Sequence, residues 1–443
     1  MATQGSGDTF RQFAAIAFFL APLGTAIAPQ ITTIFLPLVV VVLILAAMWH
    51  GPRWKDSISK SPALAACLSF SLYTFLNATW SWDPVVGLAK AALLLGLILA
   101  ILLVSAAIGA LNERQDRAFG GAFTVGAVFA IVYLLVEIAT DSAITRGAYN
   151  AFPALRPEDT KRIELAGNVV TSVKLNTLNQ GVAIAMLNLW PALLMVSRMV
   201  GKGHVYNMIA LILVGTAFVV VASEHSSSQV ALVGSAVVFA LAWNWNRFVI
   251  RMLAAFWCLA FLLVLPASFL AHDAGLQNHP SMPFSFKARV VLWNSAAEKT
   301  LEHPWLGIGV NSMREISEAT QAALTPAQKE ALRERKRHGD PTISRMPAHH
   351  GHSLFLQTWY ELGGIGAALL ALAGALVVLR AETMPKDVQP YAAAAFTTFA
   401  LIAAFAWGMW QAWWMCAIGL LALYLCLGRQ RSVSPADPQD ASL

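Results

Sequence analysis

The chain has 443 residues, of which 57% are hydrophobic and only 12% are charged. Soluble domains carry about a quarter charged residues, so the composition excludes a soluble globular protein and indicates a polytopic membrane protein. The formal net charge of +6 is modest, and the positions of the charges are more informative than their sum. We therefore expect an all-α membrane protein.

Twelve apolar stretches are long enough to cross a bilayer, whose hydrocarbon core of about 30 Å needs about 20 residues of helix. The first lacks the small-residue exit of a cleavable signal, so we expect it to stay in place. The last two meet in a tight pair near Gly408 and Trp410, which one broken helix would also explain. The stretches cover roughly residues 12–29, 31–49, 62–80, 84–108, 119–138, 178–197, 204–222, 229–245, 248–270, 353–379, 389–408 and 411–428.

Lysine and arginine residues in the short loops predict the orientation of these spans. The loops after spans two, four, six, eight and ten hold eleven of them, whereas the short loops on the other side hold none. We therefore predict cytoplasmic termini, in agreement with Arg429 and Arg431 after the last span, and long loops that face outward. The eleven residues are Arg53, Lys55, Lys60, Arg114, Arg117, Arg198, Lys202, Arg247, Arg251, Arg380 and Lys386.

The same pattern divides the chain into four parts. Residues 1–270 hold spans one to nine with a smaller outer loop at about 139–177, and residues 271–352 form a large outer loop. Residues 353–428 hold spans ten to twelve, and residues 429–443 form a cytoplasmic tail. Within the large loop, Thr325-Pro326 predicts the start of a polar helix that ends near Arg337, and we expect two or three short helices there.

Tryptophans and cysteines both follow the apolar pattern. Seven tryptophans at predicted span ends are typical of an interfacial belt. The four cysteines lie inside apolar runs, which favours buried free thiols over disulfides or a cysteine-based zinc site. The tryptophans are Trp80, Trp82, Trp243, Trp245, Trp410, Trp413 and Trp414, and the cysteines are Cys67, Cys258, Cys416 and Cys426.

A histidine cluster, His349-His350-Gly351-His352-Ser353, stands where the large loop returns to the membrane. Neutral imidazole accepts a proton from a hydroxyl near neutral pH, and His352 lies at the depth of a lipid diphosphate head. A zinc site is an alternative, although no carboxylate follows until Glu361. A histidine at the interface without a chemical role is the other alternative.

Arg289 and Trp293 lie four residues apart in the large loop, so on a helix they share a face. Arg289 can offer its fork of N–H donors to phosphate, with Trp293 packed beneath it. An arginine that only reaches lipid headgroups is an equal alternative. Lys287 precedes this pair, and His303-Pro304-Trp305-Leu306-Gly307-Ile308-Gly309 predicts a tight turn after the helix.

Further polar residues face the same side as His352. The stretch Lys174 to Gln180 enters span six, and the turn Ser223 to Gln229 enters span eight. Helix capping explains both as well as ligand binding does. The candidate binding residues from these regions and the first outer loop are Arg146, Arg162, Lys174, Asn176, Asn179, His225 and Gln229.

These motifs resemble the O-antigen ligase family, within the superfamily of O-antigen ligases and polymerases. His352-Ser353, nine further residues, Gly363, two residues and Gly366 are similar to the family's motif of His, then Asn, Ser or Gln, nine residues and Gly-x-x-Gly. The Arg289…Trp293…His303-Pro304…Gly307-Ile308-Gly309 run resembles the superfamily's second signature. Many members carry Ser-Arg at the outer start of span eight, where this chain has Ser228-Gln229.

The resemblance implies a glycosyltransferase at the periplasmic face of a Gram-negative inner membrane. It would transfer O-antigen polysaccharide from undecaprenyl diphosphate to lipid A–core, by a single inverting displacement without a metal, cofactor or nucleotide sugar. His352 would be the base and Arg289 would neutralise the departing diphosphate. His350 and Trp293 become candidate binding residues, and a second cation would come from Arg146, Arg162, Lys174 or Lys287. Inner-membrane lipids are expected partners, and nucleic acid is not.

Three other functions remain open. An O-antigen polymerase uses the same donor with a second lipid-linked glycan as acceptor, and a protein-directed oligosaccharyltransferase belongs to the same superfamily. A transporter would show repeated halves and helices broken at the midplane, and the chain has no repeat that relates its first six spans to its last six.

Overall fold

The computed structural model describes residues 2–48, 61–157, 162–342 and 348–429, and four of the residues used to predict orientation, Arg53, Lys55, Lys60 and Arg431, lie outside them. Within these ranges, eight helices are long and apolar enough to cross a membrane, and three further apolar helices are shorter. The eleven helices are α1 (Ala2–Ile27), α2 (Thr32–Met48), α3 (Pro62–Ala78), α4 (Pro84–Gly109), α5 (Glu113–Ala139), α7 (Asn179–Met199), α8 (Lys202–Ala222), α9 (Ser226–Asp273), α13 (Leu354–Leu379), α14 (Gln389–Phe405) and α15 (Ala412–Arg429).

Helix α9 contains two of the predicted spans. Its backbone leaves the helical region at Trp245, where φ is −127° and ψ is 42°, between the predicted spans 229–245 and 248–270. The apolar stretches 389–408 and 411–428 correspond to α14 and α15, which are two separate helices joined by residues 406–411. The arrangement is compatible with twelve crossings, and that number stays a prediction.

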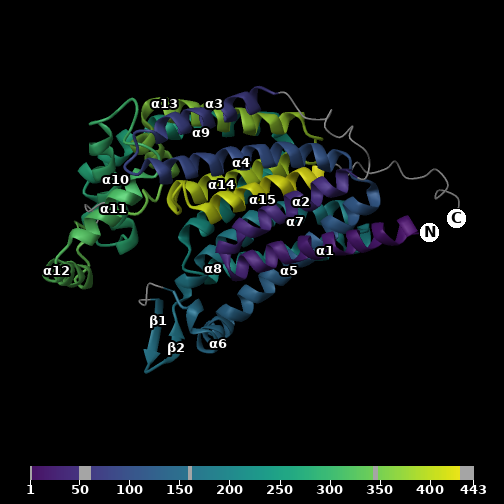
Figure 1. Cartoon of the computed structure of the whole chain (residues 1–443), viewed down its shortest axis with the longest axis horizontal. Coiled ribbons are helices and arrows are strands. Elements are labelled where there is room, and N and C mark those ends of the chain that lie inside the picture. Colours follow the sequence, from purple (N-terminus) through teal and green to yellow (C-terminus); the bar gives the residue numbers. More distant parts are fainter. Residues whose placement is uncertain (1, 49–60, 158–161, 343–347, 430–443) are drawn as a thin grey trace.

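The helices form a bundle around α7 (Figure 1). Every residue from Gly181 to Val196 is buried, as expected for a helix that is apolar on all sides and surrounded by others. Helix α7 packs against α1, α5, α8, α14 and α15. Some polar side chains in the core form hydrogen bonds between helices, and the Trp190 indole, for example, donates to Thr398 at 3.2 Å.

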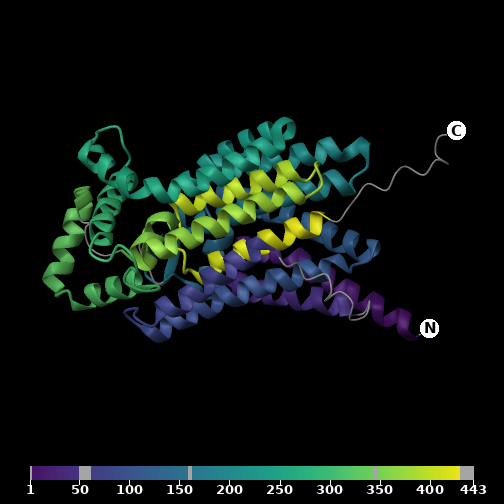
Figure 2. The ribbon, with the colours of Figure 1, turned by 90° about the horizontal axis from the view of Figure 1, so that it is seen from above.

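The polar elements gather at one end of the bundle, opposite the start of α1 (Figures 1 and 2). The large loop contains the predicted short helices, α10 (Phe284–Thr300), α11 (Ser312–Ala323) and α12 (Pro326–Arg337). The predicted start of α12 is confirmed, because Thr325 Oγ1 accepts from the backbone N–H of Gln328 at 3.3 Å and Gln328 Oε1 accepts from Thr325 N at 2.9 Å. We call this end of the molecule the loop end.

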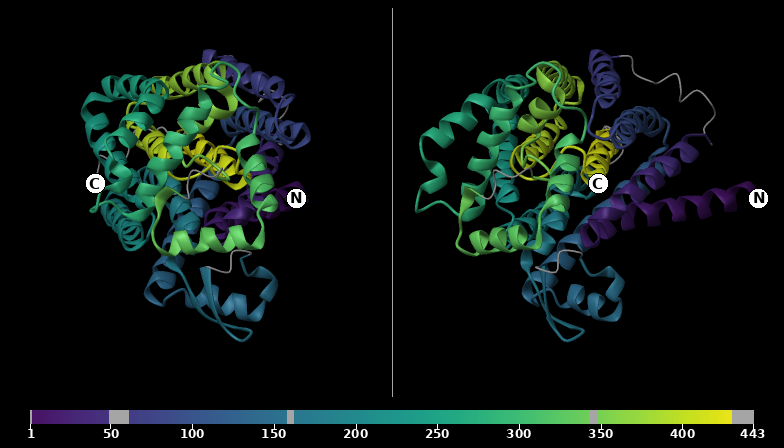
Figure 3. Two further views of the ribbon diagram at one scale, coloured as in Figure 1. Left: turned by 90° about the vertical axis from the view of Figure 1, so that its left-hand side faces the viewer. Right: turned by 60° about the vertical axis from the view of Figure 1, so that its left-hand side comes forward.

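The first outer loop differs from the all-helical expectation. It contains α6 (Ala143–Ala151) and an antiparallel hairpin of β1 (Ile163–Ala166) and β2 (Val169–Val173), with Gly167 at its turn in the left-handed region. The strands are too short for a clear alternating pattern, so the sequence did not reveal them. The hairpin projects from the side of the bundle at the loop end (Figure 3).

The prediction of a tryptophan belt is wrong for three of its seven members. Trp410, Trp413 and Trp414 are buried in the protein core with at most 3% of their surface exposed. Trp82, Trp243 and Trp245 are about 60% exposed, as an interfacial position requires. Apolar sequence alone does not separate a tryptophan that faces lipid from one that faces a neighbouring helix.

Helix α13 is interrupted two turns after it begins. Gly363 has φ 65° and ψ −170°, which places it outside the helical region and releases backbone groups on both sides. The turn after α10 satisfies them: Gly364 N–H and Ile365 N–H donate to the carbonyls of Pro304 and Trp305, at 2.8 and 3.2 Å. Non-helical backbone at membrane depth is tolerated where protein groups pair with it in this way.

The same turn after α10 also donates hydrogen bonds to the carbonyls of α13 that precede the break. Ile308 N–H and Gly309 N–H donate to the carbonyls of Tyr360 and Glu361, at 3.2 and 2.9 Å. A Cβ at Gly307 would lie 2.3 Å from the Glu361 carbonyl oxygen, and one at Gly363 would lie 2.4 Å from Trp305. Both glycine motifs therefore serve one close backbone contact, which locks the large loop onto α13.

This contact predicts a difference between two glycines of the same conformation. Gly307 and Gly275 have φ of 67° and 72°, but a Cβ at Gly275 meets nothing within 4 Å. We expect Gly275→Ala to lower the free energy of unfolding by about 1 kcal/mol, because alanine is strained in the left-handed region. Gly307→Ala should lower it by about 1–3 kcal/mol more, because its Cβ also clashes with the Glu361 carbonyl. Thermal unfolding of both variants in the same detergent measures this, and equal melting temperatures would contradict the contact.

Candidate active site

Four separate segments meet at the loop end of the bundle, joined by ring contacts and hydrogen bonds. They are the turn between α8 and α9, helix α10, the segment before α13, and the connection between α14 and α15. They carry, in this order, His225, Arg289, the pair His350 and His352, and residues 406–408. Positions far apart in the sequence thus form one site.

His352 is held in an unusual backbone conformation at the start of α13. Its φ of 48° is in the left-handed region, and the next residue, Ser353, caps the helix by accepting from Leu356 N–H at 3.4 Å. The His352 Nδ1 atom lies 2.9 Å from the carbonyl oxygen of Ala406. Since a carbonyl only accepts, Nδ1 carries the ring proton and Nε2 keeps a free lone pair.

Burial and a neighbouring cation keep His352 neutral. Its pKa falls to about 4, first because burial disfavours the charged ring and second because of the positive charge of Arg289, while the Ala406 carbonyl opposes both. At physiological pH the ring is therefore an uncharged proton acceptor.

His350 lies beside His352 with a distance of 4.2 Å between ring centroids. Its Cβ would be 2.6 Å from a Cβ placed on Gly408, so the absence of a side chain at position 408 makes room for it. Burial, followed by the neighbouring histidines, lowers the pKa of His350 to about 3. Its Nε2 atom is buried without a hydrogen-bond partner among the described residues.

His225 contributes a third imidazole from the turn before α9. Its Nδ1 lies 2.7 Å from Ser228 Oγ, and its ring stacks on Trp407 with a centroid distance of 5.5 Å. Burial and the charge of Arg289 lower its pKa to about 4. Ser228 thus positions a histidine here.

The positive charge of Arg289 acts on all three of these histidines. It is partly buried, and its guanidinium makes neither a hydrogen bond nor an ion pair with the described residues. Burial lowers its pKa, and its charge in turn lowers the pKa values of His225, His350 and His352. A desolvated cation without a counter-ion is costly, so this position is suited to receive an anion.

Trp293 connects helix α10 to the histidine segment. Its indole N–H donates to the carbonyl oxygen of Gly351 at 3.0 Å, one residue before His352. Arg289 and Trp293 therefore lie on one helix as the spacing predicts, and Trp293 fixes the position of that helix relative to His352. Lys287, on the same helix, is partly exposed.

Glu361 is fully buried in α13, between His352 and the break at Gly363, and its carboxylate connects the segments that carry the site. Its carboxylate accepts from Met313 N–H at 3.0 Å, Gln357 Nε2 at 3.1 Å and Trp410 Nε1 at 2.5 Å. Gln357 Oε1 also accepts from Met409 N–H at 3.2 Å. The carboxylate thereby joins α11, α13 and the connection between α14 and α15.

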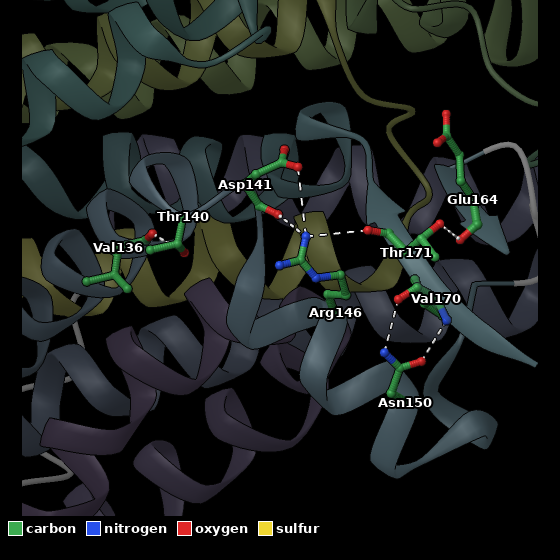
Figure 4. Close-up of polar contacts among 8 residues, drawn as sticks. All are labelled: Val136, Thr140, Asp141, Arg146, Asn150, Glu164, Val170 and Thr171. Carbon is green, nitrogen blue, oxygen red and sulfur yellow. Dashed lines mark hydrogen bonds and ion pairs between the residues drawn. The ribbon is translucent and has the colours of Figure 1, made fainter. Parts of the chain in front are cut away.

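Arg146, in the first outer loop, contacts strand β2 and the segment before α6 (Figure 4). The Arg146 guanidinium lies 3.4 Å from the Asp141 carbonyl oxygen, 3.5 Å from that of Thr171 and 3.8 Å from the Asp141 carboxylate. Asn150 pairs with both backbone groups of Val170. Arg146 therefore holds α6 against β2.

Arg162 and Lys174 are exposed at the open end of the hairpin, where Lys174 N–H donates to the Arg162 carbonyl oxygen at 2.9 Å. Asn176 is exposed in the turn that follows, and Asn179 begins α7. No contact between these four residues and the three histidines is present among the described residues.

Gln229 has a capping role. Its side-chain N–H donates to the carbonyl oxygens of Val220, Val221 and Ser223, at 3.4, 3.4 and 3.1 Å, and so closes the end of α8. Of the candidate residues, the structure thus brings together His225, Arg289, Trp293, His350 and His352.

Residues 406–408 are part of the site although no sequence pattern predicted them. Ala406, Trp407 and Gly408 each meet a different histidine, through the carbonyl, ring and glycine contacts described above. The only signal was the small residue Gly408 among tryptophans between two apolar stretches. Among the described residues, no group of three or more His, Cys, Asp or Glu side chains is placed to hold a metal ion.

Comparison with known proteins gives the family of this region. Residues 210–371 match the model of the O-antigen ligase family, and no curated protein matches the chain. The matched region begins in α8 and ends in α13, so it contains all three histidines, Arg289 and both glycine motifs. The chain therefore carries, over residues 210–371, a domain of the O-antigen ligase family, whose ligase- and polymerase-type enzymes of bacterial membranes transfer lipid-linked glycans.

Proposed function

We propose that this protein is an O-antigen ligase, which transfers O-antigen polysaccharide from undecaprenyl diphosphate to lipid A–core. The observation that carries the proposal is a neutral histidine, His352, with a free Nε2, beside an arginine that has no counter-ion among the described residues. One group can take a proton from an acceptor hydroxyl, and the other can bind an anionic leaving group.

Orientation supports a periplasmic site in a Gram-negative inner membrane. The loop end carries the three histidines and lies opposite the start of α1 (Figure 2). Arg198, Arg251 and Arg380 belong to the predicted cytoplasmic loops. With cytoplasmic termini, the site faces the compartment in which lipid-linked O-antigen meets lipid A–core.

The proposed reaction is a single displacement. The acceptor hydroxyl oxygen attacks the anomeric carbon of the donor sugar, and its proton passes to His352 Nε2. As the new C–O bond forms, the C–O bond to the diphosphate breaks, and undecaprenyl diphosphate leaves with the electron pair. Attack from the face opposite the leaving group inverts the anomeric centre.

Arg289 stabilises the charge on the departing diphosphate. Its planar fork of donors suits phosphate oxygens, and partial burial strengthens the attraction. Because this guanidinium supplies the positive charge and diphosphate is already a good leaving group, we propose that the reaction needs no metal. Transfer by purified protein in EDTA tests this, and activity restored only by a divalent ion would reject it.

Binding of the donor also raises the proton affinity of His352. The charge of Arg289 is one of the causes that lower the pKa of His352 in the substrate-free protein. A diphosphate bound to Arg289 offsets this charge and adds negative charge near the imidazole, which raises the proton affinity of His352. A base with a pKa nearer the working pH accepts a proton more efficiently.

We expect His352→Ala to reduce transfer about 10²–10⁴-fold, as loss of a general base does, and Arg289→Ala to reduce it about 10²–10³-fold, as loss of a transition-state donor does. Two matched variants serve as controls. His349 is exposed and its ring lies 3.7 Å from Glu318, and Lys299 is in the last turn of α10. His349→Ala and Lys299→Ala should retain near-normal transfer.

The measurement is the amount of O-antigen on lipid A–core in a ligase-deficient strain, with protein abundance determined in parallel. Normal attachment by His352→Ala or Arg289→Ala at equal abundance would contradict the assignment. The same strain separates the functions within the family. Loss of a ligase leaves bare core with polymer on the lipid carrier, whereas loss of a polymerase leaves core with a single repeat.

The pH dependence gives a second prediction. Since only neutral His352 can act as the base, activity should fall as the pH falls through its pKa. The acid limb of kcat/KM reports the free enzyme and should lie near the substrate-free pKa of about 4, whereas that of kcat reports the donor-bound enzyme and should lie at higher pH. Steady-state kinetics from about pH 3 to about pH 8, a range that brackets the pKa of His352 in the free protein and the ordinary histidine pKa of about 6.5, measure both. Coincident limbs would contradict the electrostatic coupling through the donor.

A further inference from the structure

Three buried nitrogen atoms at the loop end have no hydrogen-bond partner among the described residues. They are Arg289 Nε, His350 Nε2 and Trp407 Nε1. Buried polar groups are nearly always paired, and each one left unpaired costs free energy and needs an explanation. Their occurrence in one site suggests a shared function.

The contacts of residues 406–408 place these atoms in the same neighbourhood. Trp407 stacks on His225, and Gly408 lies against His350. The charge of Arg289 reaches both histidines and lowers their pKa values. The Trp407 indole is also fixed by an edge contact with Trp413, at 5.0 Å between ring centroids, so its N–H has a defined position.

The chemistry of the three groups favours an anion. An indole nitrogen only donates and a guanidinium only donates, and His350 Nε2 donates in the tautomer that carries the ring proton on this atom. The oxygens of the Glu361 carboxylate already accept from three other donors, and none of these donors is one of the three nitrogens. A ligand with several acceptor oxygens would satisfy all three nitrogens at once.

We propose that the Trp407 indole N–H, together with His350 Nε2, forms an uncharged second half of the diphosphate site, with Arg289 on one phosphate and these groups on the other. The proposal rests on the proposed function, because it takes the lipid diphosphate as the ligand of Arg289. Neutral donors then take the place of the second cation expected from the sequence. The connection between α14 and α15 then becomes part of the binding site.

Trp407→Phe tests this with little change in shape, because phenylalanine keeps an aromatic ring against His225 and removes the N–H. The probes are undecaprenyl diphosphate and undecaprenyl monophosphate, and binding to the purified full-length protein is measured by calorimetry in detergent. We expect about tenfold weaker binding of the diphosphate, the scale of one hydrogen bond to a charged group. Binding of the monophosphate should change less, so that the preference for diphosphate is reduced.

The melting temperature gives an independent test, because Trp407→Phe should weaken diphosphate binding without lowering thermal stability. Since the Trp407 N–H has no partner in the described chain, its removal should leave the melting temperature unchanged or raise it. Trp190→Phe is the matched control, because its N–H donates to Thr398 at 3.2 Å in the bundle core. It should lower the melting temperature and leave both affinities unchanged.

The outcomes separate this proposal from the function on which it depends. If Arg289→Ala binds both probes like the wild type, the diphosphate function of the site is wrong. If Arg289→Ala weakens binding but Trp407→Phe does not, only the second half of the site is wrong. Should Trp407→Phe fold poorly, benzothienylalanine at position 407 replaces the N–H with sulfur at nearly the same size, and unchanged diphosphate affinity in that protein overturns the proposal.

Discussion

The buried carboxylate of Glu361 is the interaction on which the geometry of the site depends. A carboxylate in a membrane protein core is costly unless donors surround it, and here the donors come from three different segments. Met313 fixes α11, Gln357 belongs to α13, and Trp410 fixes the connection after α14. Because the three bonds end on one carboxylate, they join the large loop, the segment after His352 and the connection that contains residues 406–408. Removal of any one donor would leave the charge less satisfied.

Because these contacts stabilise the surrounding structure, groups within the site itself can remain strained or without a partner. His352 occupies a left-handed conformation, Arg289 has no counter-ion among the described residues, and Trp407 has an unpaired N–H. Each feature costs free energy in the absence of substrate, and such features persist where the surrounding structure determines them. The backbone pairing at Gly363 and the Glu361 carboxylate provide that surrounding structure. The site is therefore prepared for a ligand that supplies negative charge and acceptor oxygens.

Sequence patterns predicted the parts of the molecule that depend on local rules. The N-cap at Thr325, the shared helix of Arg289 and Trp293, and the break between two apolar segments near Trp245 all follow from short-range spacing. Contacts between distant segments were not predictable in this way. Trp407 reaches His225 only through the folded bundle, and Gln229 closes a helix end instead of entering the site. The glycine motifs were recognised, but their physical reason, a backbone contact between the turn after α10 and the break in α13, required coordinates.

Electrostatics explains why neutral donors suit the second half of this site. Many superfamily members carry an arginine where this chain has Gln229, and the amide of Gln229 is turned toward the end of α8. A second unpaired guanidinium beside Arg289 would add like-charge repulsion in a partly buried region and would lower the pKa of His352 further. A base with so low a pKa would be a poor proton acceptor even after the donor binds. Indole and imidazole N–H groups bind phosphate oxygens without this penalty, so the negative charge of the diphosphate is left to act on a single arginine and on His352.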